Sequence, residues 1–93
     1  MSKNVSPTVL QFLEKYIGKT VRVILDRQFG FEGIIATVSS NPSGLWLSDA
    51  EAVVMRTNFV NPIPQIVSRE DRSEIFINLN SVQRIEILHK TDE

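Results

Sequence analysis

Polar side chains suited to ligand binding are concentrated in two short segments of this sequence. The first segment contains Asn41 and Ser43, and the second contains Asn78 and Asn80. An asparagine amide carries both donors and an acceptor, so it can hydrogen-bond the edge of a nucleobase. Asparagine is also common in turns, where its side chain bonds to nearby backbone groups. A turn role and a nucleotide contact both stay open for these asparagines.

Groups that could perform catalysis or bind a metal are scarce. The 93 residues include no cysteine and one histidine, His89. This composition excludes disulfides, thiolate-bound zinc and cysteine nucleophiles, and it leaves no histidine set for a metal. No carboxylate pair stands out by its spacing, and the glycine patterns of nucleotide-binding loops are absent. We therefore predict no enzyme activity, no metal, no cofactor and no small-molecule substrate.

The charge balance restricts the partners of the chain. Ten Lys and Arg residues face 11 Asp and Glu residues, for a formal net charge of −1. A globally basic nucleic-acid binder is not expected, so any anion binding must come from a local patch. No apolar run approaches the ~20 residues that span a bilayer. The first residues lack the apolar stretch of a signal peptide, and we expect a cytoplasmic protein without a membrane partner.

The elements that must position the polar segments begin with a helix. The length allows one domain, residues 1–93. Ser6 is suited to the N-cap position and Pro7 to the first helical position. Apolar residues recur at helical spacing up to Gly18, which can close the last turn. We predict a helix at about 7–17.

Alternating apolar residues after this helix predict five strands and a bent sheet. A glycine inside the second strand, Gly33, indicates a bend or a close backbone approach. Two segments are predicted as connections: a loop at 39–44, and 56–73 as a loop or the tip of a long hairpin whose arms extend the third and fourth strands. The last two strands are expected at 74–77 and 81–88, before a loose tail. The predicted fold is mainly β: a helix on a five-stranded, strongly bent antiparallel sheet or small barrel, over about 19–88.

The order of these elements and the spacing of three motifs resemble the Sm-like (LSm) family, as a divergent member of archaeal type. The motifs are Val-x-Val-x-Leu with a following aromatic-x-Gly, then Leu-x-Leu-x-Asp-Ala, then an apolar strand with a following Val-x-x-Ile. In this chain they are formed by Val21, Val23, Leu25, Phe31, Gly33, Leu45, Leu47, Asp49, Ala50, Ile75, Ile77, Val82 and Ile85.

The resemblance implies a homo-oligomeric ring of about six to eight subunits, with seven the commonest number, that acts as an RNA-binding ribonucleoprotein scaffold. In such rings, strand four of one subunit pairs with strand five of the next. The corresponding interface residues here are Ile75, Ile77, Val82 and Ile85. The candidate RNA contacts are the loop residues Asn41, Ser43, Asn78 and Asn80.

The chain departs from the family's uridine-binding loops. Ser39 stands where an aspartate is expected, Asn78 replaces an arginine and Leu79 replaces a glycine. Neither loop contains an aromatic residue that could stack on a base. The alternative is a divergent ring without the uridine-rich RNA pocket, which acts as a protein-interaction or assembly module. A third hypothesis is a monomeric small barrel that binds a peptide by strand addition.

Other charged and aromatic residues support two interpretations each. Trp46 is expected to face outward, against another subunit or as a stacking platform. A small basic patch is possible near the helix, although Asp26 and Glu32 would balance it on a solvated strand face. The run from Arg69 to Arg72 reads as an exposed, solubilising tip. The members of the basic patch are Lys3, Lys15, Lys19, Arg22 and Arg27.

Overall fold

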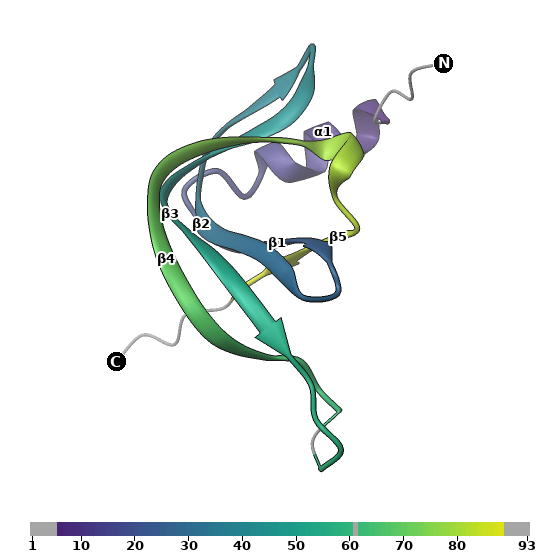
Figure 1. Cartoon of the computed structure of the whole chain (residues 1–93). Helices are drawn as coiled ribbons and strands as arrows, with labels where there is room; N and C mark the ends of the chain where they lie inside the picture. The colour runs from purple at the N-terminus through teal and green to yellow at the C-terminus, as the bar shows by residue number, and fades with distance from the viewer. Residues whose placement is uncertain (1–5, 61, 89–93) are drawn as a thin grey trace.

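The computed structural model describes residues 6–60 and 62–88, so Lys3 and the predicted tail with His89 lie outside the described residues. Figure 1 shows a curved β structure with one short helix. The elements in chain order are α1 (Pro7–Glu14), β1 (Thr20–Asp26), β2 (Phe29–Ser40), β3 (Ser43–Arg56), β4 (Gln65–Asn78), the 3-10 helix η1 (Leu79–Ser81) and β5 (Arg84–Ile87).

Helix α1 begins as predicted and ends earlier. The Ser6 hydroxyl oxygen accepts a hydrogen bond from the Thr8 backbone N–H at 3.1 Å, which caps the first turn. The helix ends at Glu14, and the chain continues to residue 17 in tighter i→i+3 turns. Gly18 has a φ of +93°, a left-handed conformation that glycine adopts without strain. Gly18 therefore turns the chain from the helical segment into β1.

The five strands form one antiparallel sheet in the order β4-β3-β2-β1-β5, which confirms the predicted fold class. Strands β3 and β4 follow a long arc in Figure 1. No ladder joins β4 to β5 within the described residues, so the sheet is bent but open. These two strands are its edges.

The bend in β2 is located at Gly33, as expected. The register between β2 and β3 shifts between Glu32 and Ile34. A Cβ added at Gly33 would lie 3.0 Å from the Ser48 carbonyl oxygen and 3.1 Å from the Leu47 Cβ. A side chain at this position would force β3 to move by a few tenths of an ångström, so the close approach of β3 favours glycine.

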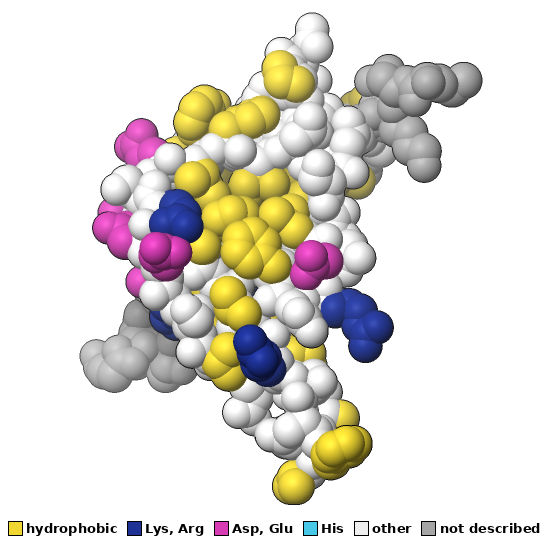
Figure 2. Space-filling view, in the orientation of Figure 1, with side chains coloured by type: hydrophobic (Ala, Val, Ile, Leu, Met, Phe, Trp, Pro, Cys, Tyr) yellow, Lys and Arg dark blue, Asp and Glu magenta, His cyan; other side chains and the backbone are white. Residues whose placement is uncertain are grey.

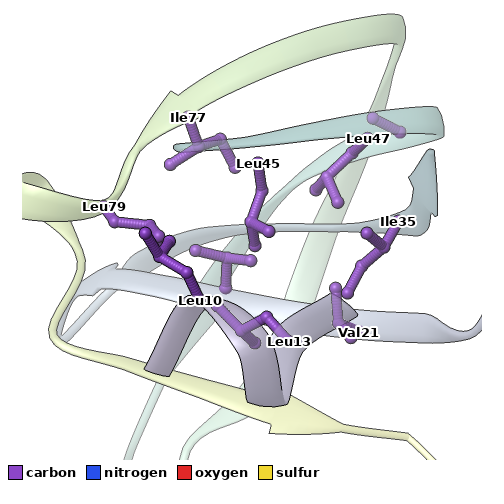
Figure 3. Packing of buried hydrophobic residues seen from close by; sticks show 10 residues of the cluster. Leu10, Leu13, Val21, Ile35, Leu45, Leu47, Ile77 and Leu79 are labelled. Carbon is purple, nitrogen blue, oxygen red and sulfur yellow. The ribbon is translucent and has the colours of Figure 1, made fainter. Parts of the chain in front are cut away.

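The core lies between the curved sheet and α1 (Figure 3). Leu10 and Leu13 project from the helix and are 9% and 4% exposed. They meet apolar side chains from four strands and η1, so the helix covers one end of the bent sheet. The other members of this core are Val21, Val23, Ile35, Leu45, Leu47, Ala50, Ile77 and Leu79.

The segment predicted as a loop at 39–44 is mostly strand. Ser39 pairs with Gly44 and Ser40 pairs with Ser43, so only two residues form the turn between β2 and β3. The Ser39 hydroxyl donates to the Pro42 carbonyl at 2.7 Å, which closes the turn. Polar residues are tolerated in this hairpin because its outer face is exposed to solvent.

The fourth strand is much longer than predicted, and the fifth is shorter. β4 begins at Gln65 instead of residue 74, which leaves the described residues 57–60 and 62–64 at the tip of the long hairpin. The charged run from Arg69 to Arg72 therefore lies in a strand and not at a tip. β5 begins at Arg84 because residues 79–81 form η1, and Val82 lies in the connection that follows.

Candidate functional site

The two polar segments meet at one end of the sheet. Gly44 pairs with Ser39 on β2 and with Asn78 on β4, so the β2–β3 turn lies beside the start of η1. Asn41 is exposed at the tip of that turn, and Asn80 is exposed in η1. We call this region, residues 39–44 and 78–81, the amide end; it is the upper end in Figure 1. Residues far apart in the sequence thus share one surface.

Two of the four predicted contact residues have a structural role. The Asn78 side-chain oxygen accepts a hydrogen bond from the Asn80 backbone N–H at 2.8 Å and so caps η1. The Ser43 hydroxyl donates to the Ser40 carbonyl at 3.3 Å. The side-chain amides of Asn41 and Asn80 make no hydrogen bond to the described residues. A turn role is therefore present for Asn78, while the amides of Asn41 and Asn80 are available to a ligand.

An aromatic pair, one exposed ring and one half-buried ring, borders the amide end. Trp46 on β3 and Phe76 on β4 are cross-strand partners, with ring centroids 5.2 Å apart. Trp46 is 44% exposed, as its predicted outward orientation requires. Residues two apart on a strand share a face, so the pair lies on the same face as Asn78. Phe76 was not singled out in the sequence, although alternation from Ile75 places it outward.

The Phe76 ring covers Gly44, which explains the glycine there. A Cβ on Gly44 would lie 2.2 Å from the nearest atom of the ring. The aromatic pair therefore lies against the backbone of the amide end.

The leucine at the glycine position of the family's motif is part of the core. Leu79 is 9% exposed and belongs to the same cluster as Leu10 and Leu13. This packing gives a physical reason for the departure, because glycine would leave the space beneath η1 unfilled.

The predicted interface residues lie on or beside the two edge strands. Ile77 is 5% exposed and belongs to the core, and Ile75 packs against that core. Val82 and Ile85 are half-buried. Their side chains contribute to the fold itself, while the outer backbone groups of β4 and β5 remain unpaired in the described sheet.

An apolar groove of about 490 Å³ runs between α1 and β5. Figure 2 shows hydrophobic side chains gathered in the middle of the face in view, below α1. Val9 and Phe12 are 46% and 51% exposed at this groove. The remaining lining residues are Thr8, Leu13, Leu79, Val82, Arg84, Ile85 and Ile87.

No family model and no curated protein sequence matches the chain. Solved structures of archaeal proteins match it over most of its length. The SmAP1 heptamer of P. aerophilum aligns with a TM-score of 0.63 and 22% identity, over 92% of this chain and 100% of that one. An Sm-like protein of Archaeoglobus fulgidus gives 0.60 and 20% identity, over 94% and 100%. The Sm protein of Pyrococcus abyssii in complex with a uridine heptamer gives 0.59 and 21% identity, over 90% and 100%.

The chain has the Sm fold. Sequence identities of 20–22% show a likeness of the fold alone. The function depends on the side chains at the surface of that fold.

On this Sm fold, a network of ion pairs crosses all five strands. Arg22 on β1 donates to Glu32 on β2 at 2.7 Å and to Glu86 on β5 at 3.1 Å. Arg69 on β4 donates to Glu32 at 2.8 Å and to Glu51 on β3 at 2.9 Å. We call these five residues the charge ladder. The predicted basic patch is thus balanced at Arg22, in agreement with the solvated-face interpretation.

Glu32 is the centre of the charge ladder. Its side chain is 12% exposed, and it accepts hydrogen bonds from two guanidinium groups. Burial by itself raises the pKa of Glu32, but the hydrogen bonds from Arg69 and Arg22 outweigh it, so this pKa lies below its usual value. The ladder therefore carries an ionised glutamate at neutral pH.

Two further observations concern the part of the Sm fold that the structure describes. No three histidine, aspartate or glutamate side chains within residues 6–60 and 62–88 come together as a metal site. None of the helices described there is long and apolar enough to cross a membrane.

Proposed function

We propose that this chain is a single, divergent Sm-like domain, residues 1–93, that assembles into a homo-oligomeric ring. The ring binds single-stranded RNA in the cytoplasm and acts as a ribonucleoprotein scaffold rather than as an enzyme. One observation carries the proposal: the two polar segments meet at one end of an Sm fold, beside the exposed Trp46 and its half-buried partner Phe76. The structural neighbours include a heptamer and a complex with a uridine heptamer.

Ring formation is supported by the two open edges. An open sheet edge offers unpaired backbone groups to another strand, and a closed ring uses every such edge. Beside the β5 edge lies the apolar groove with Phe12, while the end of β4 carries Ile75 and Ile77. Pairing of β4 from one subunit with β5 of the next would cover the groove. We infer a ring of six to eight subunits, with about seven as the expected number.

RNA binding is supported by the amides and the aromatic pair together. The amides of Asn41 and Asn80 can hydrogen-bond base edges, with Ser43 and Asn78 beside them. Trp46 supplies the ring that the loops themselves lack, and stacking on such a ring contributes about 1–3 kcal/mol per base. The amide end thus combines hydrogen bonding and stacking on one surface.

The test is a titration of the oligomer with oligo-U, oligo-A and oligo-C. Trp46 is the only tryptophan, so its fluorescence reports directly on the aromatic pair. We expect quenching by oligo-U with a Kd well below about 100 μM at low salt, the range of non-specific binding. Binding no tighter than that for every oligonucleotide would contradict the RNA-binding function.

Ring assembly is tested separately by light scattering on a sizing column. We expect a particle of six to eight chains for the natural sequence and smaller species for Phe12→Glu, which places a charge in the apolar groove. Phe59→Glu is the matched control, because Phe59 is fully exposed at the hairpin tip. A stable 10.5 kDa species of the natural chain would rule out the ring and favour strand addition by a monomer.

A second candidate function is a ring that lacks the uridine-rich RNA pocket and works as a protein-interaction or assembly module. It is favoured by the hairpin tip, where Phe59, Val60 and Ile63 are 106%, 93% and 68% exposed. Exposed apolar groups of this kind mark protein contacts. An intact ring that binds none of the three oligonucleotides would support this function over the first.

A further inference from the structure

A second, chemically different pocket lies at the other end of β3. It has a volume of about 280 Å³ and is enclosed by the β1–β2 turn, the end of β3, the long hairpin and the start of β5. β3 begins at Ser43 in the amide end and ends at Arg56 in this pocket. Apart from Arg84, which also lines the apolar groove, its residues belong to a surface that the proposed function does not use.

Three arginines line this pocket, and we call it the arginine pocket. They are Arg27, Arg56 and Arg84, and the lining includes no aspartate or glutamate. Within residues 6–60 and 62–88, no ion pair joins Arg27 or Arg56 to a carboxylate. Arg84 uses its Nε for Glu86, at 2.8 Å, which leaves its terminal N–H groups. Three guanidinium groups with no carboxylate in the pocket lining favour the binding of an anion.

The turns that carry these arginines are fixed by backbone hydrogen bonds. The Met55 N–H donates to the Gln28 carbonyl at 2.7 Å, which ties the β1–β2 turn to β3. The Gln83 N–H donates to the Ile24 carbonyl at 2.8 Å, which ties the start of β5 to β1. The three side chains are therefore attached to one rigid frame, which lowers the entropy cost of gathering them on a ligand.

The lining of the arginine pocket is mixed, because apolar side chains lie beside the polar Gln28, Thr57 and Gln83. Ile24 and Met55 are 2% and 4% exposed, and Pro62 and Pro64 come from the hairpin. Figure 2 shows basic side chains at the base of that hairpin. Arginines beside polar and apolar groups match a ligand that has a negative group, polar edges and a flat ring. A ribonucleotide has all three, and the volume is near the lower end of small-ligand pockets, about 300 Å³.

We propose that the arginine pocket binds the phosphate group of a ribonucleotide, with the adjoining base or sugar against the exposed Pro62 and Pro64. The same phosphate chemistry comes from two sources, a free mononucleotide or one link of an RNA strand. Binding of an RNA strand in this pocket rests on the proposed function, whereas binding of a free mononucleotide does not. In that case one strand contacts both ends of β3.

The first experiment is a calorimetric titration of the assembled protein at low salt with uridine monophosphate and with uridine. We expect binding of the monophosphate only. The double variant Arg27→Gln/Arg56→Gln should weaken it by about tenfold or more, because two charge-assisted contacts are removed. Arg72→Gln is the matched control, since Arg72 lies on β4 and pairs with Glu70 at 2.9 Å. The affinity of this control for uridine monophosphate should stay within about twofold of the natural chain, as expected for a distant surface charge.

The second experiment measures the salt dependence of labelled oligo-U binding by anisotropy. Each lost phosphate contact lowers the slope of log K against log salt by about 0.7 for a single strand, so the double variant should lose about 1.4. If the double variant loses monophosphate binding but keeps the salt slope of oligo-U binding, the arginine pocket is a mononucleotide site. If the salt slope of oligo-U binding falls as well, the RNA strand occupies the arginine pocket.

Three results would overturn the proposal: equal binding of uridine and its monophosphate, equal losses in Arg72→Gln and the double variant, or no effect of the double variant on either ligand. Trp46→Ala, at the amide end, separates this proposal from the proposed function. If only Trp46→Ala weakens oligo-U and the double variant still binds the monophosphate, the arginine pocket is refuted and the amide end stands. If only the double variant does so, the amide end is refuted and the arginine pocket stands.

Discussion

The two ends of strand β3 differ in the chemistry they present. At the amide end, the exposed side chains are amides beside the Trp46–Phe76 pair, and residues 39–44 and 78–81 include no cation. At the opposite end, Arg27, Arg56 and Arg84 surround a pocket without a carboxylate. Under the two proposals, base recognition and phosphate binding, which act together in most nucleic-acid sites, are therefore separated along one strand.

This separation accounts for the departure of Asn78 from the family's motif. An arginine at the amide end would supply charge there, whereas in this chain Arg27 and Arg56, which form no ion pair within residues 6–60 and 62–88, lie at the far end of β3. The charge ladder, with Glu32 at its centre, lies between the two ends and neutralises the arginines nearest to it. The near-zero net charge therefore conceals an uneven distribution of local charge.

The largest effect is expected from Leu79→Gly, which tests whether the amide end is anchored in the core. Removing this buried side chain should lower the free energy of unfolding by at least about 2–5 kcal/mol. The measurement is urea unfolding at a fixed protein concentration. Ser81→Gly is the control, because it places a glycine in the same 3-10 helix without emptying the core, and should cost about 1 kcal/mol or less. Equal losses would contradict an anchoring role for Leu79.

Trp46→Ala should weaken oligo-U binding by about 1–3 kcal/mol and leave its salt slope unchanged, because stacking involves no counterion release. Phe59→Ala removes an exposed ring from the hairpin beside the arginine pocket and should not change the affinity. Anisotropy with a labelled strand measures both. A fall in the salt slope for Trp46→Ala would show that the two ends are not chemically separate.

Glu32→Gln tests the region between the ends. Two guanidinium groups lose a charged acceptor, so the free energy of unfolding at pH 7 should fall by about 1–3 kcal/mol. Glu70→Gln removes an exposed ion pair as control and should cost about 0–1 kcal/mol. Urea unfolding of both variants beside the natural chain gives these differences.

The stabilisation from Glu32 should also depend on pH. Its pKa in the folded state lies below the unfolded value of about 4.3, so the contribution is complete above that value. It is lost as the pH falls through the lower folded pKa. The difference in melting temperature between the natural chain and Glu32→Gln should therefore shrink steadily below about pH 4. A difference that grows on acidification would contradict the lowered pKa.

Much of the fold follows from local sequence signals. The Ser6-Pro7 pair predicts the start of α1, alternating apolar residues predict the inner strands, and Gly33 predicts the bend. The extent of β4 does not follow from the sequence. Because β4 is an edge strand with much of its surface exposed, the run from Arg69 to Arg72 lacks apolar alternation and reads as a tip.

The candidate site could be predicted only in part. Asn41 and Asn80 follow from their residue type and the resemblance, whereas the position of Phe76 beside Trp46 depends on the register between β3 and β4. Register is set by the packing of a whole hairpin and not by any short motif. The arginine pocket draws its residues from three separate turns, so no spacing in the sequence reveals it.

The smallest effect is expected from Asn78→Arg, which moves a cation to the amide end. A guanidinium beside the Trp46–Phe76 pair should strengthen oligo-U binding by about 0.5–1 kcal/mol and raise the salt slope by about 0.7. Asn78→Asp is the control: it keeps a side-chain oxygen for the cap on Asn80 but adds a negative charge, and it should weaken binding. If neither variant changes the affinity, Asn78 lies outside the RNA surface. If Asn78→Arg also restores binding to the Arg27→Gln/Arg56→Gln variant, charge at either end of β3 serves the same strand.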